Sequence, residues 1–90
     1  MMNRLFLKVT YRHGKAIAAY VQLPRQTGDH VATTERIDDV LLVDRARDGR
    51  PIGIDITDPG QLDPERLFSL LASLGQTEID RDEFRPLAAA

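Results

Sequence analysis

VLLVDRARDGRPIGIDI, residues 40–56, is the stretch that decides the fold, because two apolar runs flank a polar segment there. Residues 40–43 are apolar throughout, which is typical of a strand buried on both faces. Residues 52–56 alternate isoleucine with glycine and aspartate, which is typical of a strand with one buried face. Asp48 and Gly49 favour a tight turn between the two runs. The stretch therefore predicts a β-hairpin.

The turn predicts the register of this hairpin. We expect Asp48–Gly49 to form a two-residue type I′ turn. A register shifted by one residue would divide the apolar face, so the hydrophobic pattern supports this turn. The opposed pairs are then Val43 with Ile54, Leu41 with Ile56, Arg47 with Arg50, Ala46 with Pro51 and Arg45 with Ile52.

Asp55 is an acid with apolar neighbours on the second face of the hairpin, where the register places it beside Leu42. Two interpretations stay open: a carboxylate that is solvated or paired with arginine, and a binding-site or interface carboxylate with a shifted pKa. Asp44, which the register places beside Gly53, and Glu35 from the preceding strand are the other acids of this candidate site.

These acids also follow part of a calcium-loop pattern, in which oxygen ligands surround a sharp glycine turn. Asp44, Asp48, Gly49 and Asp55 stand at the first, fifth, sixth and twelfth loop positions. The third position is Ala46, which has no side-chain oxygen, and three arginines add positive charge to the loop. The flanking runs also have strand periodicity. We therefore expect no metal and no other cofactor.

Arg45, Arg47 and Arg50 cluster at the hairpin tip, where arginines are able to contact phosphates. Proteins that bind single strands also use aromatic side chains, and this chain has only five, most of which the core needs. Solvated charge is therefore the preferred interpretation, and nucleic acid is not the expected partner. The three arginines remain candidate binding residues.

The rest of the chain predicts three more strands and one helix. The strands are expected at 5–10, 16–23 and 31–37, and Gly14 suits a hairpin turn between the first two. Alternation in the second strand places Ile17, Ala19, Val21 and Leu23 on one face. The helix, 63–74, starts at the N-cap Asp63. Its apolar stripe consists of Leu67, Leu70, Leu71 and Leu74, and Gly75 follows as the C-terminal cap.

These elements predict an α+β fold, an antiparallel β-meander of about five short strands followed by one C-terminal helix packed on one sheet face. Ninety residues suit a single domain with a modest core. We assign residues 1–76 to this domain and residues 77–90 to an acidic tail or a short second helix. The strand at 40–43 needs a cover on the face that the helix does not reach. The expected cover is a second copy, which makes the protein a homodimer.

Composition narrows the class of protein. The chain has no cysteine, which excludes disulfides and thiolate metal sites and is typical of a reducing cytoplasm. No apolar run approaches the ~20 residues that span a bilayer, and no signal peptide is recognisable. We therefore expect a cytoplasmic protein without membrane contact. The net charge of −2 divides into +3 for residues 1–53 and −5 for residues 54–90, which indicates a solvated surface with an acidic tail or a basic face for an acidic partner.

TTERIDDVLLVDRARDGRPIGIDITDP, residues 33–59, resembles the domain-of-unknown-function family 2283 of small bacterial proteins. Matching positions are Asp38, Asp39, Asp44, Asp48, Gly49, Gly53, Ile54 and Ile56. Asp55 stands where the family has glutamate, and AAYVQL (18–23) resembles a family strand with Tyr20 at its tyrosine. Tyr11 is kept from a preceding motif whose two acids this chain lacks. The resemblance covers residues 9–59 and implies a compact β-rich domain with no established activity.

Three functional hypotheses follow. The sequence has no GxSxG, HExxH or phosphate-binding glycine motif, so the first is a non-enzymatic, homodimeric protein-interaction domain. The second is an antitoxin-like module that binds a toxin protein and also DNA, because relatives of the resembled family lie beside toxin-like genes. The third is a small-ligand or enzymatic site around Asp55.

Overall fold

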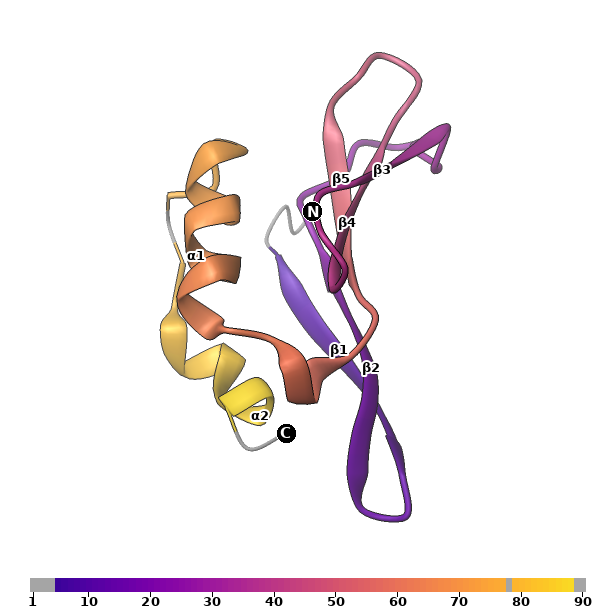
Figure 1. Cartoon of the computed structure of the whole chain (residues 1–90). Coiled ribbons are helices and arrows are strands. Elements are labelled where there is room, and N and C mark those ends of the chain that lie inside the picture. The colour runs from indigo at the N-terminus through magenta and orange to yellow at the C-terminus, as the bar shows by residue number, and fades with distance from the viewer. Residues whose placement is uncertain (1–4, 78, 89–90) are drawn as a thin grey trace.

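The computed structural model describes residues 5–77 and 79–88, and it shows a five-stranded antiparallel sheet with a helical layer on one face (Figure 1). The strands are β1 (Phe6–Arg12), β2 (Lys15–Gln22), β3 (Thr33–Arg36), β4 (Leu41–Arg45) and β5 (Pro51–Ile56). The helical segments are η1 (Pro59–Gln61), α1 (Pro64–Ser73), η2 (Arg81–Phe84) and α2 (Arg85–Ala88). The predicted α+β class, with a helix packed on one sheet face, is confirmed.

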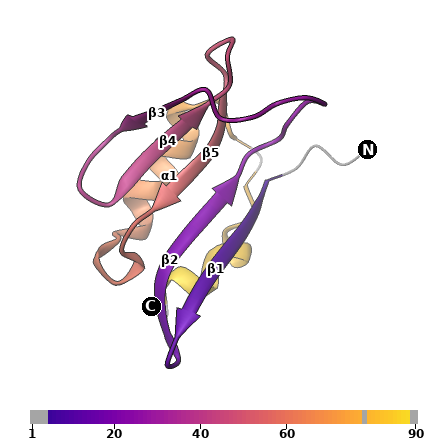
Figure 2. The same ribbon diagram turned by 90° about the vertical axis from the view of Figure 1, so that its right-hand side faces the viewer.

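The strand order is β1-β2-β5-β4-β3, so the sheet combines a hairpin with a three-stranded meander. After β2 the chain crosses to the far edge, forms β3, and returns through β4 until β5 pairs with β2 (Figure 2). This order places β5 at the centre and makes β3 an edge strand. The β4–β5 hairpin, residues 40–56 of the sequence, thus supplies the central strand of the sheet and one of its neighbours.

The tip of the β4–β5 hairpin differs from the predicted type I′ turn. Gly49 has a φ of 93°, whereas Asp48 does not take the positive φ that a type I′ turn requires. The Gly49 N–H donates to the Ala46 carbonyl and the Ala46 N–H donates to the Arg50 carbonyl, each at 2.9 Å. The loop is therefore three residues long, a type I turn closed by a left-handed glycine. The predicted pairing of two arginines across it is wrong.

Nearer the core the predicted register is confirmed. The observed pairs are Leu41 with Ile56, Leu42 with Asp55, Val43 with Ile54 and Asp44 with Gly53. A bulge between Asp44 and Arg45 absorbs the extra loop residue, so Arg45 lies opposite Pro51. The predicted partners of Arg45 and Ala46 are wrong by one residue. The faces are nevertheless kept, because Ile52 is fully buried beside the other isoleucines.

The β1–β2 hairpin has the type I′ turn that its sequence permits. His13 and Gly14 both have positive φ, 53° and 76°. A β-bulge interrupts the alternation of this hairpin, and its end extends beyond the helical layer (Figure 1). Ile17, predicted on the buried face, is consequently 42% exposed.

The core lies between the sheet and α1. Asp63 caps the helix, because its side chain accepts a hydrogen bond from the Glu65 N–H at 3.0 Å, and Gly75 ends it with a φ of 83°. Leu67 and Leu71 are fully buried and the other two stripe leucines are partly buried against the core. Fully buried partners from the sheet are Val21, Leu41, Val43, Ile52 and Ile54.

The C-terminal segment packs against the same core. Phe84 and Leu87 are only 3% and 4% exposed. The Phe84 ring meets Phe68 of α1 edge to face, with ring centroids 5.5 Å apart. The Arg81 guanidinium lies over the Phe68 ring, 4.2 Å from its centroid. Of the two alternatives for residues 77–90, the described part forms short helices.

Candidate functional site

No described helix crosses the second face of the sheet, which we call the open face (Figure 2). Its side chains form a row across all five strands, because the strand registers align them. The row runs Lys8, Tyr20, Asp55, Leu42 and Arg36. Cations stand at both edges of this row and an acid at its centre. The candidate site is built around that acid.

Asp55 and Asp44 form a hydrogen-bonded pair on neighbouring strands. Asp44 is only 6% exposed and also accepts a hydrogen bond from the Thr34 hydroxyl at 2.7 Å. A hydrogen bond between two carboxyl groups requires a proton on one of them. Burial first, and then this hydrogen bond and the charge of Asp44, raise the pKa of Asp55 to about 6. The pair therefore holds one proton at mildly acidic pH and changes its charge close to neutrality.

Tyr20 lies across the strand next to this pair. A Cβ on Gly53, which is opposite Asp44, would collide with the Tyr20 ring and hydroxyl, so only glycine lets the ring lie there. The Arg25 Nη2 donates to the Tyr20 hydroxyl at 2.7 Å, and its Nε donates to the Ile52 carbonyl at 3.3 Å. Burial is the main cause that raises the pKa of the Tyr20 phenol. The ring thus helps to keep water from the acid pair.

Of the three candidate acids, the structure brings two together and separates the third. Glu35 lies opposite Val43, so its side chain points to the face that α1 covers. There it pairs with Arg45, whose Nη2 lies 3.1 Å from its carboxylate. Glu35 therefore belongs to an ion pair at the β3 edge and has no part in the Asp44–Asp55 site.

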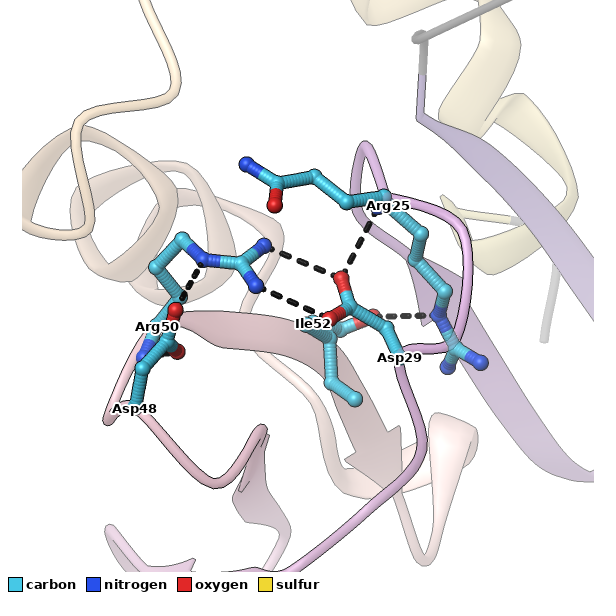
Figure 3. Close-up of polar contacts among 6 residues, drawn as sticks. Arg25, Asp29, Asp48, Arg50 and Ile52 are labelled. Carbon is cyan, nitrogen blue, oxygen red and sulfur yellow. Dashed lines mark hydrogen bonds and ion pairs between the residues drawn. The ribbon is translucent and has the colours of Figure 1, made fainter.

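The tip arginines are largely engaged with acids and carbonyls. Arg50 donates two hydrogen bonds to Asp29, at 3.0 and 2.8 Å, and a third to Asp48 at 2.8 Å (Figure 3). These bonds hold the pKa of Asp29 at about 2 and connect the loop after β2 to the hairpin tip. Arg45 also donates to the Gly49 carbonyl at 2.9 Å, whereas Arg47 is exposed. The tip therefore does not present three free cations.

Asp38, the first of the two acids before β4, has a structural explanation. Asp38 accepts hydrogen bonds from the Val40 and Leu41 N–H groups, both at 2.9 Å, and from Arg66 at 3.0 Å. It lines a cavity of about 290 Å³ between this turn and the start of α1. Across residues 5–77 and 79–88, no group of three or more acids and histidines is placed to hold a metal ion.

Sequence reasoning missed Arg25 and Thr34 and understated Tyr20. Glycine inside an isoleucine strand is a signal for a close approach, so Gly53 indicates that something lies over it. Nothing in the pattern says that the group is Tyr20, because β2 and β5 are far apart in the chain. Arg25 and Thr34 carry no signal at all, since a loop arginine and an edge-strand threonine are ordinary surface residues.

We expect Asp55 to titrate with a midpoint near pH 6, measured by carboxyl chemical shifts in a pH series. Asp44→Asn should lower that midpoint, since it removes the negative neighbour, but should leave it above 3.8 because burial, the largest cause of the shift, remains. Because native Asp55 keeps its proton above the ordinary value of 3.8, stability should fall as pH rises from about 4 to about 6. Asp55→Asn should remove that fall. An unshifted midpoint near 4 would contradict the pairing.

Comparison with protein-family models, curated proteins and solved structures found no match to this chain. Among the described residues, no helix has both the length and the apolar character needed to cross a membrane.

Proposed function

We propose that the protein is a protein-interaction domain that forms a homodimer through the open face of its sheet. The observation that carries the proposal is the Asp44–Asp55 pair, in which Asp44 is buried and Asp55 half-buried, on a face that no described helix covers. Removing acids from water costs stability unless a cation compensates them. A partner that supplies this cation would recover part of that cost, and groups with shifted pKa values cluster at functional sites.

The rest of the open face has the composition of a polar interface. Phe6 is 42% exposed, and Tyr20 and Leu42 are partly exposed among charged residues. Aromatic anchors surrounded by polar groups are typical of non-obligate interfaces. A standard interface takes roughly 800 Å² from each partner. This is about a seventh of the 5845 Å² accessible surface of the chain.

Light scattering and sedimentation velocity across the micromolar range test this proposal, with a mass of twice 10.1 kDa as the expected result. Ala18→Arg places a long charged side chain on the open face, two residues along β2 from Tyr20, and should give a folded monomer. Ala72→Arg is the matched control, because Ala72 is exposed on α1 and should leave the dimer intact. A monomeric wild-type chain, or a dimer that tolerates Ala18→Arg, would contradict the proposal.

A further inference from the structure

The β1–β2 hairpin carries three exposed cations on the open face: Lys8, Arg12 and Lys15. Within the part of the chain that the structure describes, none of them forms an ion pair, although most other cations do. Residues 1–28 contain no acid at all. We call these three residues the cationic strip. Its uncompensated charge lies on the same surface as the Asp44–Asp55 pair.

One residue of the strip, Lys8, and one acid of the pair, Asp55, are placed symmetrically about β2. In the row across the sheet, Lys8 lies next to Tyr20 on one side and Asp55 lies next to Tyr20 on the other. Neighbouring strands are about 4.8 Å apart, so the cation and the acid are about one strand spacing from Tyr20 in opposite directions. An isologous interface requires such a pattern, in which one surface carries both complementary halves.

We infer that two open faces stack about a two-fold axis that runs parallel to the strands above β2, so that Lys8 of each copy meets Asp55 of the other. This inference rests on the proposed homodimer and specifies its geometry. The axis places Tyr20 against Tyr20 of the second copy and gives two equivalent Lys8–Asp55 contacts. Packed sheets lie about 10 Å apart, a gap that a lysine and an aspartate together span.

Such a contact makes assembly depend on pH. The groups that face Asp55 within its own chain are Tyr20 from β2 and Asp44 from β4, with Lys8 and Arg36 farther along the row. Its pKa of about 6 means that it loses its charge in mild acid. A lysine ammonium from the second copy favours the charged form, so deprotonation and assembly promote each other. The dimer should therefore be tightest above pH 6.

The dimer dissociation constant, measured by sedimentation equilibrium, tests this geometry. We expect it to rise roughly a hundredfold from pH 7 to pH 5, which is about tenfold for each of the two contacts. Lys8→Glu and Asp55→Asn should each weaken the dimer at least about tenfold at pH 7 and remove most of the pH dependence. The double charge exchange Lys8→Glu with Asp55→Lys should restore assembly. Arg85→Glu, a charge reversal on the helical side, is the control and should change little.

The Asp55→Asn variant distinguishes a loss of association from a loss of folding. Asp55→Asn removes a half-buried charge that has a negative neighbour, so the dilute monomer should be at least as heat-stable as wild type at pH 7 while its assembly is lost. If the dimer dissociation constant does not change with pH, with Lys8→Glu or with Asp55→Asn, this geometry is wrong although the proposed dimer is not contradicted. A wild-type monomer would overturn both. Failure of the charge exchange to restore a dimer lost in the single variants would exclude a direct Lys8–Asp55 contact.

Discussion

Phe84→Ala is expected to lower the free energy of unfolding by about 3–4 kcal/mol, the largest effect of any change considered for this chain. The ring is 97% removed from solvent, since only 3% of it is exposed, and it meets Phe68 edge to face. Its loss removes the buried apolar area and leaves a cavity under η2. A domain of this size has a total stability of about 5–10 kcal/mol, so the loss is a large fraction of it.

The measurement is urea unfolding followed by circular dichroism, with thermal unfolding as a second probe. The midpoint temperature should fall by roughly 12–32 °C, since 1 kcal/mol corresponds to about 4–8 °C in a domain of this length. Arg85→Ala, one residue along the chain and exposed, should change stability by less than about 0.5 kcal/mol. If both variants were equally mild, residues 79–88 would not belong to the core.

Gly53→Ala should destabilise the protein by about 1–2 kcal/mol and should also change the titration of the acid pair. The added methyl group occupies the space of the Tyr20 ring, so the ring must swing away and release Arg25. Water then reaches Asp44 and Asp55, and the pKa of Asp55 should move down from about 6 toward its ordinary value of 3.8. The cost is moderated because alanine suits a strand better than glycine does.

A double-mutant cycle with Tyr20→Ala isolates this contact. In the Tyr20→Ala background the ring is gone, so Gly53→Ala should be neutral or slightly stabilising. The pKa of Asp55 should be low in Tyr20→Ala with or without the second change. Additive losses of stability in the cycle would show that the glycine is needed for its backbone and not for the ring above it.

Phe84 and Gly53 lie on opposite faces of the sheet, so the two substitutions test the two faces separately. Phe84 completes a conventional core, in which apolar area is buried against α1 and the strands. Gly53 serves the other face, where a tyrosine and an arginine shield two acids at a cost in stability. The Asp44–Asp55 pair adds nothing to the core between the sheet and α1. Its cost in stability is explained if the open face binds a second copy of the chain.

The positions of the two acids Asp44 and Asp55 on one face could be predicted from the hairpin sequence alone. The hairpin register placed Asp44 beside Gly53 and Asp55 beside Leu42, because side chains alternate with a period of two and the isoleucines allow one register only. The same rule applied to β3 would have separated Glu35 from them, but it required knowing which residue of β3 pairs with β4. That register is set by an exposed four-residue edge strand with no apolar face to define it.

The turn at the hairpin tip shows a different limit. Asp48–Gly49 suits both a two-residue type I′ loop and a three-residue loop with a left-handed glycine, and both place glycine at positive φ. In the observed three-residue loop, Arg50 donates hydrogen bonds to Asp48 locally and to Asp29 from a loop about twenty residues earlier. No local pattern contains that second contact.

The sequence by itself determined what depends on neighbours along the chain. The strand alternation, the capped leucine helix and the hairpin core register are local, because periodicity and caps act over a few residues. Tertiary structure decided the strand order that places β5 beside β2. Only that pairing brings Tyr20 over Gly53 and aligns Lys8, Tyr20 and Asp55 in one row. The acid pair was readable from one hairpin, but its burial and its raised pKa come from a strand more than thirty residues away.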